Sequence, residues 1–452
     1  MKIVSEANAS VLSILRKFLK TENCARWLHY CVQTSVEDGI LVVNLLTREL
    51  VLLSQEEHDH YTELDYLKEH WFVVPEATKE KEYAELVRWV LTARQPKAKN
   101  ITAYTIFTTT DCNARCFYCF EMGRSRVPMS CETAEKVVAY IKDHSAGQDV
   151  NIGWFGGEPL FNVDAIDTIV AGLQGEGIKF RSRMTSNGYL FDDEMVQRAA
   201  AQWNLKRVQI TLDGTEKVYN KIKAFIYPNT NPFEIVINNI GRLLDASIRV
   251  TVRLNMDMYN ANDLLNLVEE LAQRFAGQKG LTVYAHHLFD ADTTLAELHT
   301  DEEWEERDAA MCRLTECIHR NGLASKAGIS KNIKLNHCMA DGGKSVTILP
   351  DGSIGLCEHH TESEFIGHID TEGLDADVLA SWKELVPEIP ECEKCFYFLD
   401  CRLLKKCSSS NMCYRQLRRE HYRNMQHKME CEYENWKVQQ ALTEGDNDND
   451  DC

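Results

Sequence analysis

The middle of the chain alternates short apolar runs with longer amphipathic stretches, which is the pattern of βα units. Six apolar runs are predicted to be buried strands: residues 103–109, 150–155, 179–185, 207–212, 248–254 and 282–287. The stretches between them have helical spacing; in residues 132–144, for example, Ala134, Val137, Val138 and Ile141 share one face. Six units in about 190 residues fit the ~30-residue βαβ repeat. The pattern therefore predicts an α/β region with a parallel sheet.

The first hundred residues follow a different pattern. Strand-like runs at 29–34, 39–44 and 49–53 are separated by Glu37-Asp38-Gly39 and by residues 46–48, which predicts a small antiparallel sheet. Helical patterns at 56–70 and 79–91 follow, and the polar segment 96–100 reads as a linker. We therefore expect a separate small α+β domain at residues 1–98.

Length and charge limit the function classes. A chain of 452 residues predicts two or three domains, and a net charge of −19 argues against a nonspecific nucleic-acid binder. A cationic or leader-bearing peptide remains a possible partner. Residues 441–452, which end in EGDNDNDDC, are expected to form an acidic disordered tail. We find no signal peptide and no bilayer-spanning apolar run, so we expect a cytoplasmic protein without membrane attachment.

Seventeen cysteines in such a chain point to metal binding or catalysis, because the cytosol keeps thiols reduced. Cys112, Cys116 and Cys119 are spaced C-x3-C-x2-C. A 4Fe-4S cluster normally takes four thiolates. A loop with three cysteines leaves one iron free for an exchangeable ligand. A zinc loop or three buried structural cysteines are the alternatives.

This triplet, with an aromatic residue before its last cysteine, resembles the radical S-adenosylmethionine (radical SAM) enzymes. The resemblance implies that the amino and carboxylate groups of SAM chelate the open iron. Electron transfer then cleaves SAM to a 5'-deoxyadenosyl radical, which abstracts a hydrogen atom from the substrate. It also implies a partial (β/α)6 TIM-like barrel, which we place at residues 99–310.

In such barrels the chemistry gathers at the C-terminal ends of the strands. Gly156, Gly157 and Glu158 follow the second predicted strand and match the GGEP motif, which in this family lines the amino group of SAM. By the same resemblance, Ser186, Asn187, Asp213 and Arg253 would contact SAM, with Asn255 nearby. Asn-Gly and Asp-Gly are also ordinary turn dipeptides, and Arg253 also suits a salt bridge at the barrel rim.

The C-terminal cysteines form a second pattern. Cys338 and Cys357 fit C-x13-G-x4-C, and Cys392, Cys395 and Cys401 fit C-x2-C-x5-C. This order resembles the SPASM extension, which carries two auxiliary 4Fe-4S clusters, and we place it at residues 311–440. The family pattern has its next cysteine after three residues, whereas here it comes at Cys407 or Cys413.

The resemblance assigns Cys392, Cys395, Cys401 and Cys431 to a distal cluster. It assigns Cys338, Cys357, Cys407 and Cys413 to a proximal one. An upstream ligand such as Cys317, an open iron, or a structural zinc site is the alternative. With the SAM loop, the assignment uses eleven cysteines and implies three 4Fe-4S clusters.

These features together predict a radical SAM and SPASM peptide maturase. It would install a thioether or carbon-carbon crosslink in a ribosomally made precursor peptide and take electrons from a donor such as flavodoxin or ferredoxin. The N-terminal domain resembles winged-helix peptide-recognition elements, which bind a leader as an added strand; a simple cap is equally compatible. Glu358, beside Cys357, is a candidate general base, although Glu358, His359 and His360 also suit an exposed loop. The alternatives are a formylglycine-forming oxidase similar to anaerobic sulfatase maturases, and a zinc-stabilised protein without catalysis.

Overall fold

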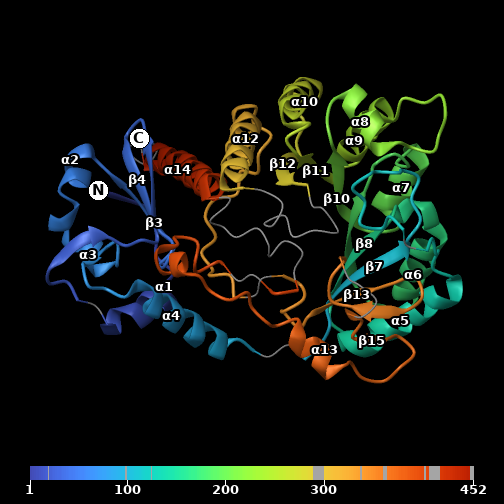
Figure 1. Ribbon diagram of the computed structural model, residues 1–452, viewed down its shortest axis with the longest axis horizontal. Coiled ribbons are helices and arrows are strands. Elements are labelled where there is room, and N and C mark those ends of the chain that lie inside the picture. Colours follow the sequence, from blue (N-terminus) through green and yellow to red (C-terminus); the bar gives the residue numbers. More distant parts are fainter. Residues whose placement is uncertain are drawn as a thin grey trace.

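The computed structural model consists of a barrel-like α/β region, a small N-terminal domain and a C-terminal segment that connects them (Figure 1). It describes residues 1–18, 20–96, 99–123, 125–288, 300–335, 338–359, 364–401, 404–406 and 418–447. Within these ranges, no helix combines the length and hydropathy that a membrane crossing needs.

The α/β region is built on a nine-stranded sheet in the order β12-β11-β10-β9-β8-β7-β13-β14-β15. Its first six strands are parallel and lie in sequence order. They are β7 (Ala103–Thr109), β8 (Val150–Gly156), β9 (Phe180–Ser186), β10 (Leu205–Leu212), β11 (Arg249–Met256) and β12 (Leu281–His287). The predicted parallel sheet and the partial-barrel fold class are confirmed.

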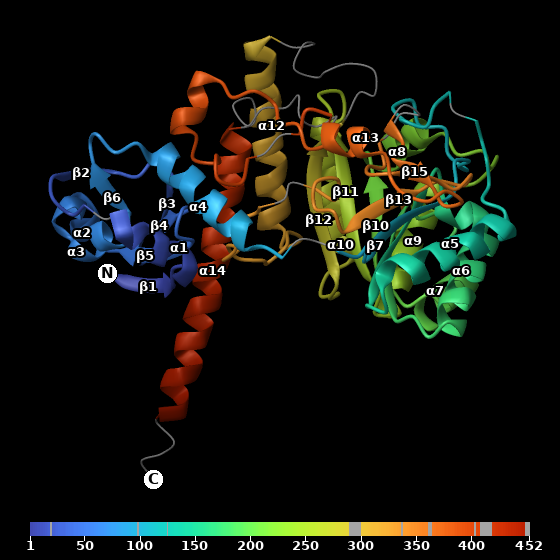
Figure 2. The same cartoon turned by 90° about the horizontal axis from the view of Figure 1, so that it is seen from below.

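Helices cover the outer face of this sheet (Figures 1 and 2). Trp154, Val208 and Ile210 point outward into the main hydrophobic core, where they are completely buried. The covering elements are α5 (Cys131–Ser145), η3 (Pro159–Asn162), α6 (Val163–Gly175), α7 (Asp193–Ala201), α8 (Glu216–Lys223), α9 (Pro232–Asp245), α10 (Ala261–Arg274) and α12 (Asp301–Arg320).

The inner face of the sheet is polar. Gly153 on β8 pairs with Arg183 on β9, and Arg183 pairs with Arg207 on β10. Two residues further along the strands, Thr185 pairs with Gln209. Parallel sheets in α/β proteins are usually apolar on both faces. A polar inner face therefore indicates that the barrel encloses a polar cavity and is not filled by a hydrophobic core.

The C-terminal segment also contributes to the sheet. β13 (Ser345–Ile348) pairs in parallel with β7, and β14 (Ser353–Gly355) and β15 (Gly367–His368) extend it with antiparallel pairing. Helix α12 runs across residue 310, where the sequence predicted a domain boundary. The cysteine-rich region is thus continuous with the barrel.

The N-terminal domain holds a four-stranded antiparallel sheet in the order β1-β5-β4-β3 and a two-stranded sheet of β2 and β6. Its elements are β1 (Lys2–Ser5), α1 (Ala9–Leu15), η1 (Arg16–Phe18), β2 (Cys24–Trp27), β3 (Cys31–Val36), β4 (Gly39–Asn44), β5 (Glu49–Leu53), α2 (Gln55–Asp59), η2 (Tyr61–Glu63), α3 (Asp65–Glu69), β6 (Val73–Pro75) and α4 (Glu80–Arg94).

The single helix predicted at residues 56–70 is wrong, because the segment forms α2, η2 and α3. The backbone leaves helical geometry at His60 (φ −109°, ψ 28°) and at Leu64 (φ −79°, ψ 108°). The breaks turn Tyr61, Leu64 and Tyr66 onto a small core beneath the sheet. Burial of these side chains therefore overrides the local helical spacing.

The C-terminal segment packs on the N-terminal domain and shares a hydrophobic core with it. Helix α14 (Arg418–Asn447) places Met425, Met429 and Tyr433 among residues of α1, α4 and the four-stranded sheet. The turn η5 (Pro390–Lys394) is followed by Phe396, Phe398 and Leu399, which enter the same core, and α13 (Ala376–Ser381) precedes it. Helix α14 reaches Asn447 (Figure 2), so residues 441–447 are helical where the sequence predicted a disordered tail. Helix-forming residues such as Gln440, Ala441 and Leu442 continue its last turns.

Candidate active site in the partial barrel

The predicted cluster loop follows β7 and is tied to the end of α8. The backbone N–H of Arg115 donates to the carbonyl of Lys223 at 2.8 Å, and that of Ile226 donates to the carbonyl of Asn113 at 3.0 Å. The carboxamide of Asn187, after β9, donates to the Asn113 side chain at 2.6 Å and lies 3.7 Å from the sulfur of Cys112. The fold therefore brings the residues after the first and third barrel strands together, as the sequence predicted.

Several predicted ligand cysteines share one local geometry. The sulfurs of Cys112, Cys338 and Cys357 each accept a backbone N–H from two residues further on, at 3.3, 3.2 and 3.3 Å. Hydrogen bonds to sulfur are one means by which proteins set the reduction potential of an iron-sulfur cluster. Burial, helped by Glu158, raises the pKa of Cys112 to about 12. A thiolate there needs the positive charge of bound metal, and in this respect the residues fit the implied cluster.

Gly156 and Gly157 allow the end of β8 to lie directly against the cysteine loop. A Cβ atom on Gly157 would be 2.3 Å from the carbonyl oxygen of Asp111, and one on Gly156 would be 2.1 Å from that of Thr109. Gly156 also has a φ of +127°, a region that side chains disfavour. The Gly-Gly pair therefore fixes the position of the backbone that leads into Cys112.

The buried carboxylate of Glu158 accepts hydrogen bonds from residues at the end of β9 and just after it. It accepts hydrogen bonds from the Ser186 hydroxyl at 2.9 Å and from the backbone N–H groups of Asn187 and Leu160 at 2.8 and 3.2 Å. Burial raises the pKa of Glu158 to about 7, although these hydrogen bonds oppose the shift. The carboxylate orients Ser186 and Asn187, two of the predicted SAM contacts.

Asp213 belongs to a buried network that joins the cysteine loop to β10, β11 and α8. The Tyr118 hydroxyl donates to the Asp213 carboxylate at 2.8 Å, and the Lys223 ammonium lies 3.0 Å from the same carboxylate. Lys223 also donates to Tyr118 and to Thr211, and Asn255 donates to Asp213 at 3.2 Å. Burial opposes the charge on Lys223, but Asp213, Tyr118, Cys116 and Tyr219 together outweigh it and hold the pKa of the ammonium well above its usual value. Tyr118 is the aromatic residue before the last cysteine of the motif, but the sequence did not predict its role in this network, and it did not identify Lys223, which belongs to no motif.

A cavity of about 290 Å³ lies on the polar inner face of the barrel. Its lining includes Arg183, Arg207, Arg253, Gln209, Glu358 and His359. Glu358 and His359 come from the segment after β14, so the cysteine-rich region contributes to the same cavity as strands β9, β10 and β11. Arg253 and Glu358, which the sequence predicted for different roles, therefore line one cavity.

The predicted auxiliary ligands are spread over several elements. Cys392, Cys395 and Cys401 lie in or just after η5, Cys431 lies on α14, and the alternative ligand Cys317 is buried in α12. Cys407, Cys413 and His360 fall outside the described residues. Within the described ranges, no three Cys, His, Asp or Glu side chains form a group that could hold one metal ion.

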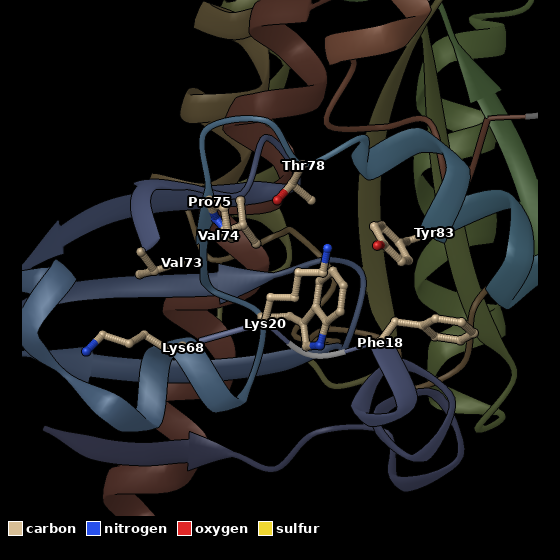
Figure 3. Close-up of a pocket in the computed structure, with 9 residues that line it drawn as sticks. Phe18, Lys20, Lys68, Val73, Val74, Pro75, Thr78 and Tyr83 are labelled. Atoms are coloured by element: carbon tan, nitrogen blue, oxygen red, sulfur yellow. The ribbon is translucent and has the colours of Figure 1, made fainter. Parts of the chain in front are cut away.

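The N-terminal domain contains a much smaller hollow between η1, α3, β6 and α4 (Figure 3). Phe18, Val74 and Tyr83 line it, and its volume is about 20 Å³. That volume accommodates about one water molecule and excludes a peptide side chain. A peptide partner of this domain would therefore bind on a sheet edge or an exposed face.

Known proteins resemble this chain mainly over the barrel. Residues 106–271 match the family model of the radical SAM superfamily. The chain is 31% identical over 127 residues to a probable GTP 3',8-cyclase of Methanococcus maripaludis strain C6, covering 28% of this chain and 41% of that relative. It is 23% identical over 168 residues to the sporulation killing factor maturation protein SkfB of Bacillus subtilis strain 168, covering 37% and 39%. The chain thus spans less than half of either relative.

Solved structures agree on the fold. Native anSMEcpe with bound AdoMet and Cp18Cys peptide superposes with a TM-score of 0.55 at 14% identity, covering 75% of this chain and 99% of that one. The match extends beyond the 106–271 segment. The structural match shows the fold alone, whereas the radical SAM resemblance predicted from the motifs is confirmed for residues 106–271, which match the superfamily model.

Proposed function

We propose that the protein is a radical SAM peptide maturase with a SPASM-type C-terminal region, which installs a thioether or carbon-carbon crosslink in a ribosomally made precursor peptide. The observation that carries this proposal is the packing of the Gly156-Gly157 turn against Thr109 and Asp111, which lead into the cysteine loop, together with the contact of Asn187 with Cys112 in that loop. The names of two similar proteins support a polypeptide substrate: SkfB is a maturation protein, and anSMEcpe was solved with a peptide.

In this proposal Cys112, Cys116 and Cys119 hold a 4Fe-4S cluster that binds SAM. When bound, the cluster and SAM supply the one-electron cleavage that produces the 5'-deoxyadenosyl radical. Gly156 and Gly157 let the backbone approach SAM, and Glu158 keeps Ser186 and Asn187 oriented toward it. Asp213 holds Tyr118, and with it the cysteine loop, in place. Arg253, which lies on β11 and lines the cavity, faces SAM from the barrel wall.

The first test is SAM cleavage by the anaerobically purified and reconstituted protein. With dithionite as reductant we expect 5'-deoxyadenosine, and we expect Cys116→Ala to abolish it. Cys131→Ala is the matched control, because Cys131 is exposed at the start of α5. If Cys116→Ala cleaved SAM as fast as Cys131→Ala, the assignment of the cluster loop would be wrong.

Glu358 is proposed as the general base, since it lines the same cavity as the barrel arginines. We expect Glu358→Gln to lose crosslinked product while 5'-deoxyadenosine formation persists, because removal of a proton follows generation of the radical. Glu372→Gln serves as control, since Glu372 is exposed in the segment between β15 and α13. Full product from Glu358→Gln would remove Glu358 from the mechanism.

Two auxiliary 4Fe-4S clusters are proposed on Cys392, Cys395, Cys401 and Cys431, and on Cys338, Cys357, Cys407 and Cys413. Three clusters correspond to about 12 iron atoms per chain. Comparing Cys407→Ala with Cys413→Ala tests the proximal set, since loss of a true ligand should lower the iron content by up to about 4 atoms. About 4 iron atoms in the unmodified protein, accompanied by zinc, would contradict both auxiliary clusters.

A leader peptide and an electron donor such as flavodoxin or ferredoxin are the proposed partners. The four-stranded sheet ends in β1 and β3. The Gln426 side chain on α14 donates to the backbone carbonyl of Gln33 in β3 at 2.9 Å, so α14 covers that edge. The outer edge of β1 is then the proposed place for an added leader strand.

Product chemistry separates this proposal from a formylglycine-forming oxidase, the alternative that the sequence analysis left open. A crosslink joins two residues, so protease digestion should release one connected fragment. A formylglycine product would instead carry an aldehyde that reacts with hydroxylamine and leave no joined fragment. The identity of the product thus decides between the two candidates.

A further inference from the structure

We propose that the barrel cavity binds a carboxylate of the substrate polypeptide through Arg183 and Arg207. This inference rests on the proposed function, because it takes the substrate to be a peptide and adds which of its groups the barrel recognises. The carboxylate belongs to an Asp or Glu side chain or to the C-terminus of the peptide.

The two arginines are neighbours on the inner wall. Arg183 on β9 and Arg207 on β10 occupy paired positions, and both line the cavity. A Cβ on Gly153 would lie 3.3 Å from Nε of Arg183, so this guanidinium extends across the glycine on the adjacent strand. The Nε of Arg207 donates to the Thr251 hydroxyl at 2.9 Å, which fixes its guanidinium from the other side. The absence of a side chain at Gly153 thus makes room for the pair.

Within the part of the chain that the structure describes, the charges of this pair have no acidic partner. Among the described residues, Arg183 and Arg207 form no ion pair with an acidic side chain, and Glu358 is the only acidic residue in the cavity lining. Like charges at facing positions of neighbouring strands destabilise a sheet. Guanidinium groups bind carboxylates bidentately, with two parallel hydrogen bonds. A bound anionic ligand therefore neutralises the guanidinium groups of Arg183 and Arg207.

Arg253 lies nearer the C-terminal ends of the strands than Arg183 and Arg207, and it has other neighbours. It pairs with Thr211 on β10 and with Tyr284 on β12. The Tyr284 hydroxyl in turn donates to the Gln209 side chain at 3.1 Å. Because Arg253 is proposed to face SAM, the lower pair of Arg183 and Arg207 remains for the substrate.

Arg183 and Arg207 lie too deep in the barrel to contact SAM, so their position suits a group of the substrate better than a group of the cofactor. Arg183 precedes Ser186, at the end of β9, by three residues, which at ~3.3 Å per residue places its Cα about 10 Å below the layer proposed to contact SAM. A carboxylate held there would anchor the end of a side chain, and the carbon atoms nearer its backbone would point up toward the cysteine loop. The Phe155 side chain adds an apolar wall to the same cavity.

The test measures chemical labelling of arginine by phenylglyoxal in the reconstituted holoenzyme with SAM, read residue by residue by mass spectrometry. The probes are short N-acetylated, C-amidated peptides that contain one Glu, the same peptide with Gln, and the Gln peptide with a free C-terminus. By mass action, the Glu peptide at ~10 times its Kd should slow labelling of Arg183 and Arg207 about tenfold. Arg181 is the internal control, since it lies two residues earlier on β9 and lines a different hollow.

Each outcome bears on the proposal. Protection by the Glu peptide or by the peptide with a free C-terminus supports it and tells the two sources of carboxylate apart. Equal protection by the Glu and neutral Gln peptides, or protection by GTP alone, overturns it. Arg183→Gln and Arg207→Gln should weaken Glu-peptide binding at least about tenfold while Arg181→Gln leaves it unchanged. If labelling is protected but no peptide is ever modified, the proposed function fails and the anion site stands. If peptides are modified equally well with and without carboxylates, the inference alone fails.

Discussion

Replacing Gly157 by alanine would place a methyl group inside the backbone that supports the cysteine loop. The new Cβ would lie 2.3 Å from the carbonyl oxygen and 2.7 Å from the carbonyl carbon of Asp111. Both are backbone atoms, so no side-chain rotation relieves the clash, and the loop must move by about 1 Å. Overpacking of this kind costs about 1–3 kcal/mol. The shift also strains the hydrogen bond from Glu158 N–H to Asp111 at 2.9 Å, worth about 1 kcal/mol.

We therefore expect Gly157→Ala to lose about 2–4 kcal/mol of folding free energy in the barrel. A displacement of about 1 Å at the cluster loop should also reduce SAM cleavage by roughly 100-fold. The assays are thermal unfolding followed by circular dichroism, iron per chain after reconstitution, and the rate of 5'-deoxyadenosine formation.

Gly175→Ala is the control, because Gly175 ends α6 and its added Cβ would meet nothing within 4 Å. That variant should be neutral or slightly more stable, since alanine favours a helix over glycine by about 1 kcal/mol. If Gly157→Ala matched Gly175→Ala in unfolding temperature, iron content and SAM cleavage, the geometric reasoning would be refuted.

Two further predictions concern buried ionisable groups. Lys223→Met should lower the free energy of unfolding by about 3–5 kcal/mol, because it leaves Asp213 charged and buried. Adding Asp213→Asn should recover part of this loss, as measured by urea unfolding. A double variant as unstable as Lys223→Met would contradict this reasoning. Burial and the charge of Arg253 lower the pKa of His286 to about 4. Between pH 4 and pH 6.5, His286 is protonated in the unfolded chain but neutral in the folded protein. The free energy of unfolding is therefore highest above pH 6.5 and decreases as the pH falls below that value. From pH 7 to pH 5 the contribution of His286 should be a loss of about 2 kcal/mol, and His286→Gln should not show this part of the loss.

The barrel strands were predictable because each one is locally marked. A strand whose outer face is covered by helices leaves an apolar run, and β7 and β5 begin and end where the sequence predicted. β13 was not predicted, since its four residues form a weak local pattern and its parallel partner β7 lies more than 200 residues earlier. Local sequence carries no information about such a partner. For the same reason the segment at 56–70 was read as one helix, although the packing of Leu64 breaks it.

The residues of the site differ in the same way: some belong to a local motif, and others are brought together only by the fold. Cys112, Gly156 and Gly157 belong to a compact motif, so their proximity was expected. Lys223 reaches the site only because α8 ends beside the cysteine loop. No spacing of residues in the sequence predicts this proximity. Arg183 and Arg207 did leave a signal, because charged residues facing inward are unusual in a buried parallel sheet. Polar residues at every second position of β9 and β10 would have indicated the cavity.

The shared core between the N-terminal domain and α14 has a consequence for synthesis of the chain. Tyr30, Trp71 and Val87 share a hydrophobic core with Phe396, Met429 and Tyr433, so the N-terminal domain is completed by a helix that is synthesised much later. At ~5–20 residues/s, the apolar surface of the early domain waits for roughly 20–70 s before its partner emerges. During that interval it should depend on chaperones, and a chain that stops at residue 320 should be cleaved within residues 1–98 by a protease that spares the full protein. The N-terminal domain and α14 thus form one late-maturing unit, while the barrel between them can fold as it is made.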